Sequence, residues 1–260
     1  MRSTDMADEL FGGSDALPAG VRLATAKRGG VTVTRVEIAR EGLARPRGRY
    51  VTLEMPSVSV LDERDAAVIE TCAAELRALL PPEGPVLVLG IGNRRVTADA
   101  LGPRTAQKIL VTMGPHHALP VKGIRPVAAI APGVSASTGL TLRQLAGALV
   151  DAVRPAVLIC VDSLCSSEGA RLGRSIQFSD TGLYPAQVDH AKHLDAAGLG
   201  VPVIAAGIPT LMDSDEGADL VVTPRALDSV IAHGSALLAG AINRALQPRL
   251  SVAQLCWLAG

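Results

Sequence analysis

The chain has 260 residues, which is enough for one large α/β domain with additions and too few for two full domains. Lysine plus arginine number 25 and aspartate plus glutamate number 25, so no net charge draws the chain to nucleic acid or to an anionic membrane. Aromatic residues make up only 2% of the chain, which removes the stacking platforms that single-strand nucleic-acid binders use.

Targeting signals and cysteine spacing bear on the compartment. The start of the chain has no basic segment followed by an apolar one, and no apolar run approaches the roughly 20 residues that span a bilayer. We therefore expect a cytoplasmic protein without a membrane partner. The four cysteines show no C-x-x-C spacing, which favours reduced thiols, with Cys160 in the core.

The first part of the chain differs in pattern from the rest. Residues 1–20 are polar and contain glycine, so we expect a mobile segment there. Residues 31–38 and 50–54 alternate apolar and polar side chains, which predicts antiparallel strands in a β addition at about residues 30–56. Residues 21–260 are expected to form a single α/β domain that carries this addition.

Helical and strand patterns alternate over the remainder. Asp62 is a candidate N-cap for the first helix, and Thr141 with Gln144 forms a capping box for a later one. Helices are predicted over residues 62–80, 102–113, 141–153 and 226–246, and apolar strands over 86–89, 126–131, 156–161, 175–178 and 201–206. This alternation predicts an α/β fold with a mainly parallel sheet and helices on both faces.

Two of the apolar strands lead into an aspartate. The strand at 86–89 continues into a loop that contains Asp99, and the strand at 156–161 is followed directly by Asp162. Chemistry in an open parallel sheet collects outside the carboxyl ends of the strands, so the two carboxylates can share one site. The competing interpretation makes Asp99 a turn residue and Asp162 a strand-end cap, because aspartate is common at both positions.

Other candidate motifs are incomplete. Residues 90–93 read G-I-G-N after a strand, but Arg95 stands where a dinucleotide-binding loop has its third glycine. Residues 133–137 read G-V-S-A-S and lack the second glycine of a nucleophile elbow. His190 and His193 have helical spacing and can complete a metal site with the two aspartates, although a solvated helix face has the same pattern.

Seven blocks of the chain together resemble the germination protease of spore-forming bacteria in their order and spacing. They are residues 50–56, 86–103, 125–139, 162–168, 176–185, 201–210 and 221–231. The resemblance implies an endopeptidase that degrades the small acid-soluble proteins coating spore DNA at germination. It also implies a homo-oligomer made as a zymogen in the forespore, with no cofactor and no direct binding of nucleic acid.

The same resemblance implies an atypical aspartic peptidase whose two essential aspartates correspond to Asp99 and Asp162. A close pair of carboxylates shares one proton, so one can take a proton from water while the other donates to the scissile carbonyl. Gly92 and Asn93 are supporting candidates that can hold the carbonyl oxygen, orient Asp99 or simply form a tight turn. Residues 138–142 and 185–191 depart from the family pattern, which leaves the substrate specificity open.

Two alternatives remain. The family's fold is similar to that of the hydrogenase-maturation peptidases, which bind a metal through carboxylates and a histidine. A metal-dependent processing peptidase would use Asp99, Asp162 and His190. A peptide-binding or assembly protein without enzymatic activity would use the two aspartates as structural residues.

Residues 4–9 read T-D-M-A-D-E and resemble both the family's own processing site and the cleaved segment of its substrates. This predicts cleavage between Asp5 and Met6, in a segment extended enough to enter the active site of its own chain or a neighbouring one. The competing interpretation is a short disordered tail.

Overall fold

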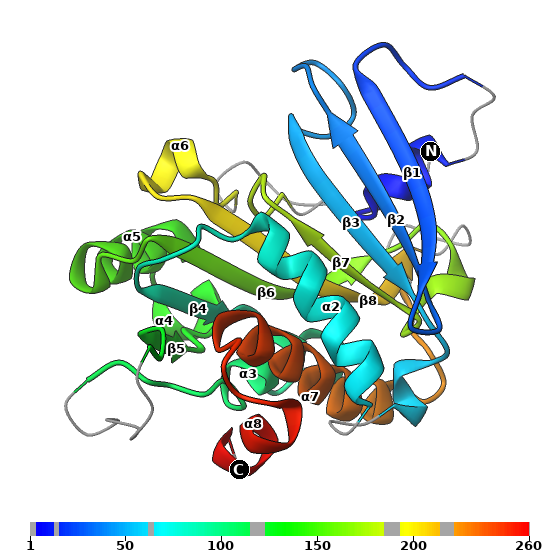
Figure 1. Ribbon diagram of the computed structural model, residues 1–260. Helices are drawn as coiled ribbons and strands as arrows, with labels where there is room; N and C mark the ends of the chain where they lie inside the picture. The colour runs from blue at the N-terminus through cyan, green and yellow to red at the C-terminus, as the bar shows by residue number, and fades with distance from the viewer. Residues whose placement is uncertain are drawn as a thin grey trace.

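The computed structural model describes residues 4–12, 16–61, 65–114, 123–184, 193–213 and 221–259. These ranges form one sheet with helices on both sides (Figure 1). The strands are β1 (Val21–Arg28), β2 (Val31–Ile38), β3 (Gly48–Glu54), β4 (Val86–Gly90), β5 (Val127–Ile130), β6 (Val157–Cys165), β7 (Ser175–Ser179), β8 (Val203–Asp213) and β9 (Val221–Val222). Their order across the sheet is β1-β2-β3-β7-β8-β6-β4-β5, with β9 paired to β8.

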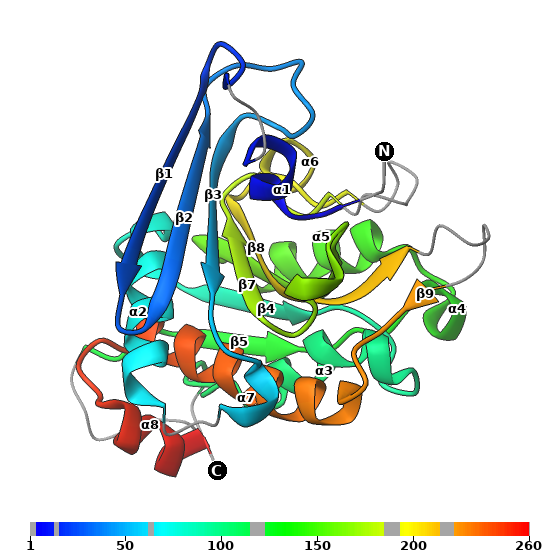
Figure 2. The same cartoon turned by 90° about the vertical axis from the view of Figure 1, so that its right-hand side faces the viewer.

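The helices cover the sheet in two layers, as the sequence predicts. They are α1 (Ala7–Phe11), α2 (Ala66–Leu79), α3 (Leu101–Ala106), α4 (Ser135–Thr138), α5 (Leu142–Val153), α6 (Ala196–Leu199), α7 (Leu227–Leu246) and α8 (Val252–Ala259). The larger hydrophobic core lies between the sheet and α2, α3 and α7, and a smaller core lies beneath α5 on the opposite face (Figure 2). Burial of these apolar faces is the main force that holds the layers together.

The prediction of a mainly parallel sheet is corrected by the strand pairings. Strands β5, β4, β6 and β8 form a parallel block, but five of the eight pairings among the described residues are antiparallel. β7 lies between β3 and β8 and runs antiparallel to both, so the N-terminal hairpins and the core share one sheet. A short strand buried on both faces carries no sequence signal for its direction, which is why the pattern did not reveal this.

Several element boundaries also differ from the sequence prediction. β1 was not predicted, and α3 ends at Ala106 rather than near residue 113. β6 continues past Asp162 to Cys165 because β8 pairs with it over this stretch. The capping box of Thr141 and Gln144 at the start of α5 is confirmed, whereas α2 begins after Asp65 and Asp62 lies outside the described residues.

The start of the chain packs against the sheet, although its composition predicts mobility. Met6 and Ala7 are fully buried, and Phe11 of α1 contacts a cluster that includes Val36 and Tyr50. The segment packs because three apolar side chains within six residues are enough to dock one helical turn. So short an apolar pattern is not distinguishable from the polar sequence around it. Residues 1–3 and 13–15 lie outside the described ranges.

Two further expectations concern cysteines and membrane spans. All four cysteines lie in the described part of the chain and none forms a disulfide, and Cys160 is fully buried in β6 as predicted. Among the described residues, no helix has both the length and the apolar character needed to cross a bilayer.

Candidate active site

Glycines let the loop that carries Asp99 fold directly onto the edge of the sheet. A Cβ on Gly90 would lie 2.1 Å from the carbonyl oxygen of Gly102, and one on Gly102 would lie 2.3 Å from that of Val161. The backbones of β4, α3 and β6 therefore touch where any side chain would separate them. The hydroxyl of Thr210 on β8 donates to the carbonyl of Ala98 at 2.9 Å and ties the loop down.

Asp99 ends a short 3-10 turn (Thr97–Asp99) between β4 and α3, and the G-I-G-N turn fixes its side chain. The backbone N–H of Asn93 donates to Asp99 Oδ2 at 2.7 Å, and the side chain of Asn93 accepts from the N–H of Arg95. Gly92 has a φ of +122°, and a Cβ there would lie 2.8 Å from Asp99 Oδ1. This geometry fits two of the roles predicted for Gly92 and Asn93, orienting Asp99 and forming a tight turn.

Asp162 lies on β6, the strand next to β4. Gly90 of β4 pairs with Val161, so the loop after β4 and the Asp162 position share one edge of the sheet. The N–H of Ser163 donates to Asp162 Oδ1 at 2.8 Å. Burial raises the pKa of the Cys160 thiol, and the charge of Asp162 raises it further. This effect is expected because the two residues are two apart and lie on the same face of the strand.

A small cavity of about 30 Å³ lies beside Asp162. Its lining includes Asp5, Arg45, Ser163 and Gln177 as well as Asp162. Ser163 Oγ is buried there and has no hydrogen-bond partner among the described residues. A space of this size with several polar groups around it is suited to a water molecule. A carboxylate and a hydroxyl that can bind water thus meet at the cavity.

A larger hollow of about 430 Å³ lies on the side of Gly92 and Asn93. Its walls come from the loop after β4 and from the segment that leads into α4, including Arg95 and Ser137. The loop of Asp99 therefore has a groove beside it that is wide enough for side chains of a polypeptide.

The predicted processing site lies next to Asp162 rather than in a free tail. The N–H of Asp5 donates to the carbonyl of Cys165 at 2.8 Å, and the N–H of Cys165 donates back to Asp5 Oδ2 at 2.7 Å. Met6 follows and is fully buried. The bond between Asp5 and Met6 therefore follows a residue that lines the same cavity as Asp162.

Only some of the predicted metal ligands lie among the described residues. Within the described ranges, no three His, Cys, Asp or Glu side chains gather into a group that could hold a metal. The rings of His193 and Tyr184 contact each other at a tilt of 55°, with their centroids 4.7 Å apart. His190 lies outside the described residues, so the site of Asp99, Asp162 and His190 stays a prediction.

Three polar residues of this region, Arg45, Ser163 and Gln177, were missed by the sequence argument. Arg45 is one of several arginines in a loop, and Gln177 is one polar residue in a short strand. Ser163 directly follows Asp162, and its adjacency to this candidate carboxylate is the one signal that could have singled it out.

Comparisons with known proteins identify the class of this protein. A family model described as germination protease matches residues 14–216. A germination protease of Clostridium perfringens is 32% identical over 282 residues, which is 85% of this chain and 86% of that protein. One of Priestia megaterium is 34% identical over 82% of this chain and 60% of its own length. The class is therefore a spore protease.

The chain belongs to the germination protease family, and the resemblance predicted from the sequence blocks is confirmed. Among solved structures, a NiFe hydrogenase maturation protease from Thermococcus kodakarensis is similar at 20% identity and a TM-score of 0.42. That match covers 66% of this chain and 98% of the other.

Proposed function

We propose that this protein is an endopeptidase that degrades the small acid-soluble, DNA-coating proteins of spores at germination, with Asp99 and Asp162 activating the attacking water. The observation that supports the proposal most is the delivery of both aspartates to one edge of the sheet by the neighbouring parallel strands β4 and β6. Family membership supports the peptidase class. The proposal includes action in the spore core as a homo-oligomer.

The chemistry follows from the charge of the pair. Two neighbouring carboxylates do not both ionise readily, so they hold one proton between them. The ionised member takes a proton from water as the oxygen adds to the scissile carbonyl carbon, and the protonated member donates to the carbonyl oxygen. When the tetrahedral intermediate collapses, the C–N bond breaks and the leaving amine takes the proton that the first carboxylate removed from water. One hydroxyl of the intermediate returns its proton to the second carboxylate, which restores the starting pair. Asn93 keeps Asp99 oriented throughout through its backbone N–H.

The same site cleaves its own chain between Asp5 and Met6. The support is that Asp5 and Asp162 line one cavity. Acidification promotes this step because it places the single shared proton on the pair.

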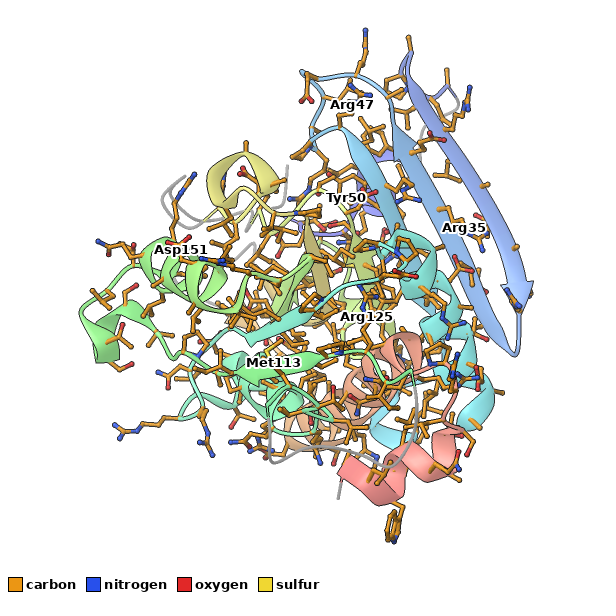
Figure 3. The ribbon with its side chains drawn as sticks, turned by 60° about the vertical axis from the view of Figure 1, so that its left-hand side comes forward. Arg35, Arg47, Tyr50, Met113, Arg125 and Asp151 are labelled. Carbon is orange, nitrogen blue, oxygen red and sulfur yellow. The ribbon has the colours of Figure 1, made fainter. Side chains whose placement is uncertain are left out.

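The test is degradation of purified small acid-soluble spore proteins by the wild-type protein and by Asp99→Asn and Asp162→Asn. Each variant should fold and lose cleavage, because the pair fails when either member cannot ionise. Asp151→Asn is the matched control, since Asp151 is exposed on α5 (Figure 3). Retained turnover in either folded site variant contradicts the proposal.

A second arm separates the carboxylate pair from a metal site. Activity should survive EDTA, and His190→Ala should lose little. Loss of a metal ligand typically lowers affinity or activity by tenfold or more. Stoichiometric zinc or nickel whose removal abolishes activity would favour the metal-dependent alternative.

A further inference from the structure

A hollow of about 610 Å³ lies between α3, α7 and α8, on the side of the sheet that carries the larger core (Figure 1). Its lining combines small residues of α7, such as Ala236 and Ala239, with apolar residues of α8, such as Leu255 and Ala259. The volume falls within the range of about 300–1,000 Å³ that small-molecule sites occupy. This space, the α3–α7–α8 hollow, is therefore large enough for an organic ligand.

Among the described residues, three cations and no acidic side chain line the α3–α7–α8 hollow. Arg94 comes from the loop after β4, Arg104 from α3, and Lys108 from the turn that follows α3. All three are exposed, and none makes an ion pair within the part of the chain that the structure describes. With its amide oxygen turned toward Arg94, Gln107 accepts from both terminal nitrogens of that guanidinium, at 3.1 and 3.2 Å. A neutral amide orients the cation without cancelling its charge.

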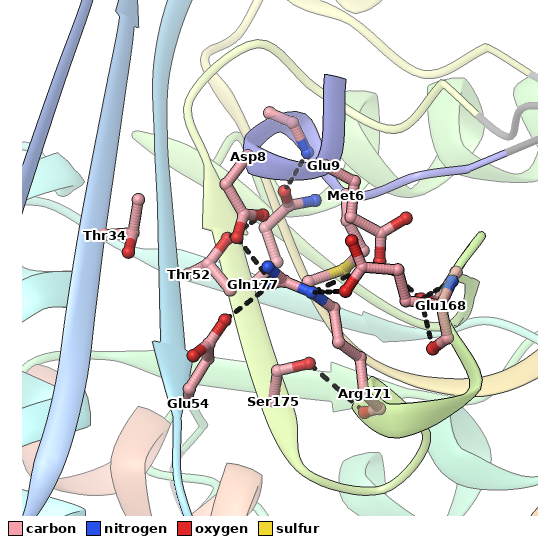
Figure 4. A network of polar contacts seen from close by, with 12 residues as sticks. Met6, Asp8, Glu9, Thr34, Thr52, Glu54, Glu168, Arg171, Ser175 and Gln177 are labelled. Atoms are coloured by element: carbon pink, nitrogen blue, oxygen red, sulfur yellow. Dashed lines mark hydrogen bonds and ion pairs between the residues drawn. The ribbon is translucent and has the colours of Figure 1, made fainter. Parts of the chain in front are cut away.

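Other arginines of this chain do have carboxylate partners. Arg171, for example, pairs with Asp8 and Glu54 (Figure 4). The difference at the hollow begins in the sequence, because residues 84–150 contain seven lysines and arginines and a single acidic residue, Asp99. A local excess of one charge in a chain without net charge indicates a site for a ligand of the opposite sign. The hollow therefore carries positive charge that an anionic ligand can neutralise.

Hydrogen bonds of Asn243 on α7 hold the cationic side of the hollow in place. Its amide nitrogen donates to the carbonyl of Lys108 at 3.0 Å, and its amide oxygen accepts from the N–H of Leu110 at 2.9 Å. Asn243 is buried, so water does not compete for these bonds. The backbone that carries Lys108 is thus fixed against α7 before any ligand binds, which lowers the conformational cost of binding.

We propose that the α3–α7–α8 hollow binds a small organic phosphate, with the phosphate at Arg94, Arg104 and Lys108 and the apolar part against α8. A phosphate monoester carries about 1.5 to 2 negative charges at neutral pH and three acceptor oxygens, which suit guanidinium and ammonium groups. The apolar wall of α8 favours a small organic phosphate over a nucleic-acid backbone, which would leave that wall bare. The inference goes beyond the proposed function, since it involves neither aspartate of the pair.

An NMR titration of the ¹⁵N-labelled full chain with phenyl phosphate tests the site. Binding should saturate with a Kd of about 1 mM or tighter, and the amide signals of Lys108, Ala239 and Leu255 should shift. Phenol lacks the charge and should not bind measurably. Inorganic phosphate lacks the apolar part and should bind about tenfold more weakly than phenyl phosphate.

Replacing single cations checks that they hold the phosphate. Arg104→Met and Lys108→Met should each weaken the binding of phenyl phosphate about tenfold, because each substitution removes a charge-assisted hydrogen bond. Arg95→Met is the matched control, since Arg95 is an exposed arginine next to Arg94 that does not line this hollow. Its Kd should stay within about twofold of wild type, because solvent screens a charge outside the site. Circular dichroism shows which variants are folded.

Equal Kd values for phenyl phosphate in wild type and in folded Arg104→Met and Lys108→Met would overturn the inference. Should those variants not fold, the wild-type protein decides, because a titration that does not saturate, or shifts confined to residues outside the hollow, overturn it without any variant. Binding of a duplex DNA oligonucleotide without binding of phenyl phosphate would assign the cations to a nucleic-acid backbone instead. None of these outcomes depends on peptidase activity, so the proposed function stands or fails separately.

Discussion

Replacing Gly92 by alanine tests whether the turn after β4 positions Asp99. The φ of +122° at this residue strains any side chain by about 1–3 kcal/mol. The new Cβ would also lie 2.1 Å from the carbonyl oxygen of Asp99, whereas real Cβ atoms stay beyond 3.0 Å. The Asp99 backbone must therefore retreat by roughly 1 Å, which weakens the hydrogen bond from Asn93, worth about 1.5–3 kcal/mol.

Gly114→Ala is the matched control, because Gly114 has a φ of +106° and no atom within 4 Å of its added Cβ. Urea unfolding should show a loss of about 1–3 kcal/mol for Gly114→Ala from strain alone. Gly92→Ala should lose roughly 3–6 kcal/mol and about a hundredfold in kcat/KM on small acid-soluble spore proteins, because a 1 Å displacement of a catalytic group costs about that much. Equal stability losses in the two variants, with Gly92→Ala fully active, would refute the positioning role.

Three further predictions concern single side chains. Burial raises the pKa of Tyr50 to about 12, so this hydroxyl ionises at lower pH in the unfolded chain than in the folded one. The free energy of unfolding should therefore fall by up to about 3 kcal/mol as the pH rises from 10 to 12, and urea unfolding of Tyr50→Phe should lack this fall. The hydroxyl of Tyr184 lowers the pKa of Asp195, so the stability that this bond provides should be present at pH 6 and vanish as acid protonates Asp195; an acid titration of Tyr184→Phe checks this. Ser163→Ala should leave the free energy of unfolding within about 0.5 kcal/mol of wild type and lower kcat, because the Ser163 hydroxyl faces the cavity and bonds to no described group; unchanged kcat would contradict a role in holding water.

The sequence predicts the parts of the fold whose signals are local. The capping box at Thr141 specifies the start of α5, and the apolar runs that alternate with helices identify the parallel block. The direction of β7 and its place between β3 and β8 depend on contacts between residues far apart in the chain, such as Ser179 with Ala205 on one side and with Tyr50 on the other. No local pattern carries that information.

The candidate site also has parts that local sequence predicts and parts that depend on contacts between distant residues. The nearness of the Asp99 loop to Asp162 is predictable because both follow apolar runs that form neighbouring parallel strands, in which Gly90 pairs with Val161. Arg45 becomes relevant only through its contacts with residues 40 and 139 positions away, Asp5 and Tyr184. The docking of residues 4–12 likewise depends on partners on β6 and β7, and the polar composition of that stretch points to mobility instead.

A double-mutant cycle tests whether Asp99 and Asp162 act as one unit. The kcat/KM for a small acid-soluble spore protein is measured for wild type, Asp99→Asn, Asp162→Asn and the double variant, with circular dichroism to show that each is folded. Residues that act as a unit have grossly non-additive effects, so the double variant should be no slower than the slower single variant. If the losses of kcat/KM in the single variants multiply in the double variant, the two residues act independently, which would contradict a shared catalytic unit.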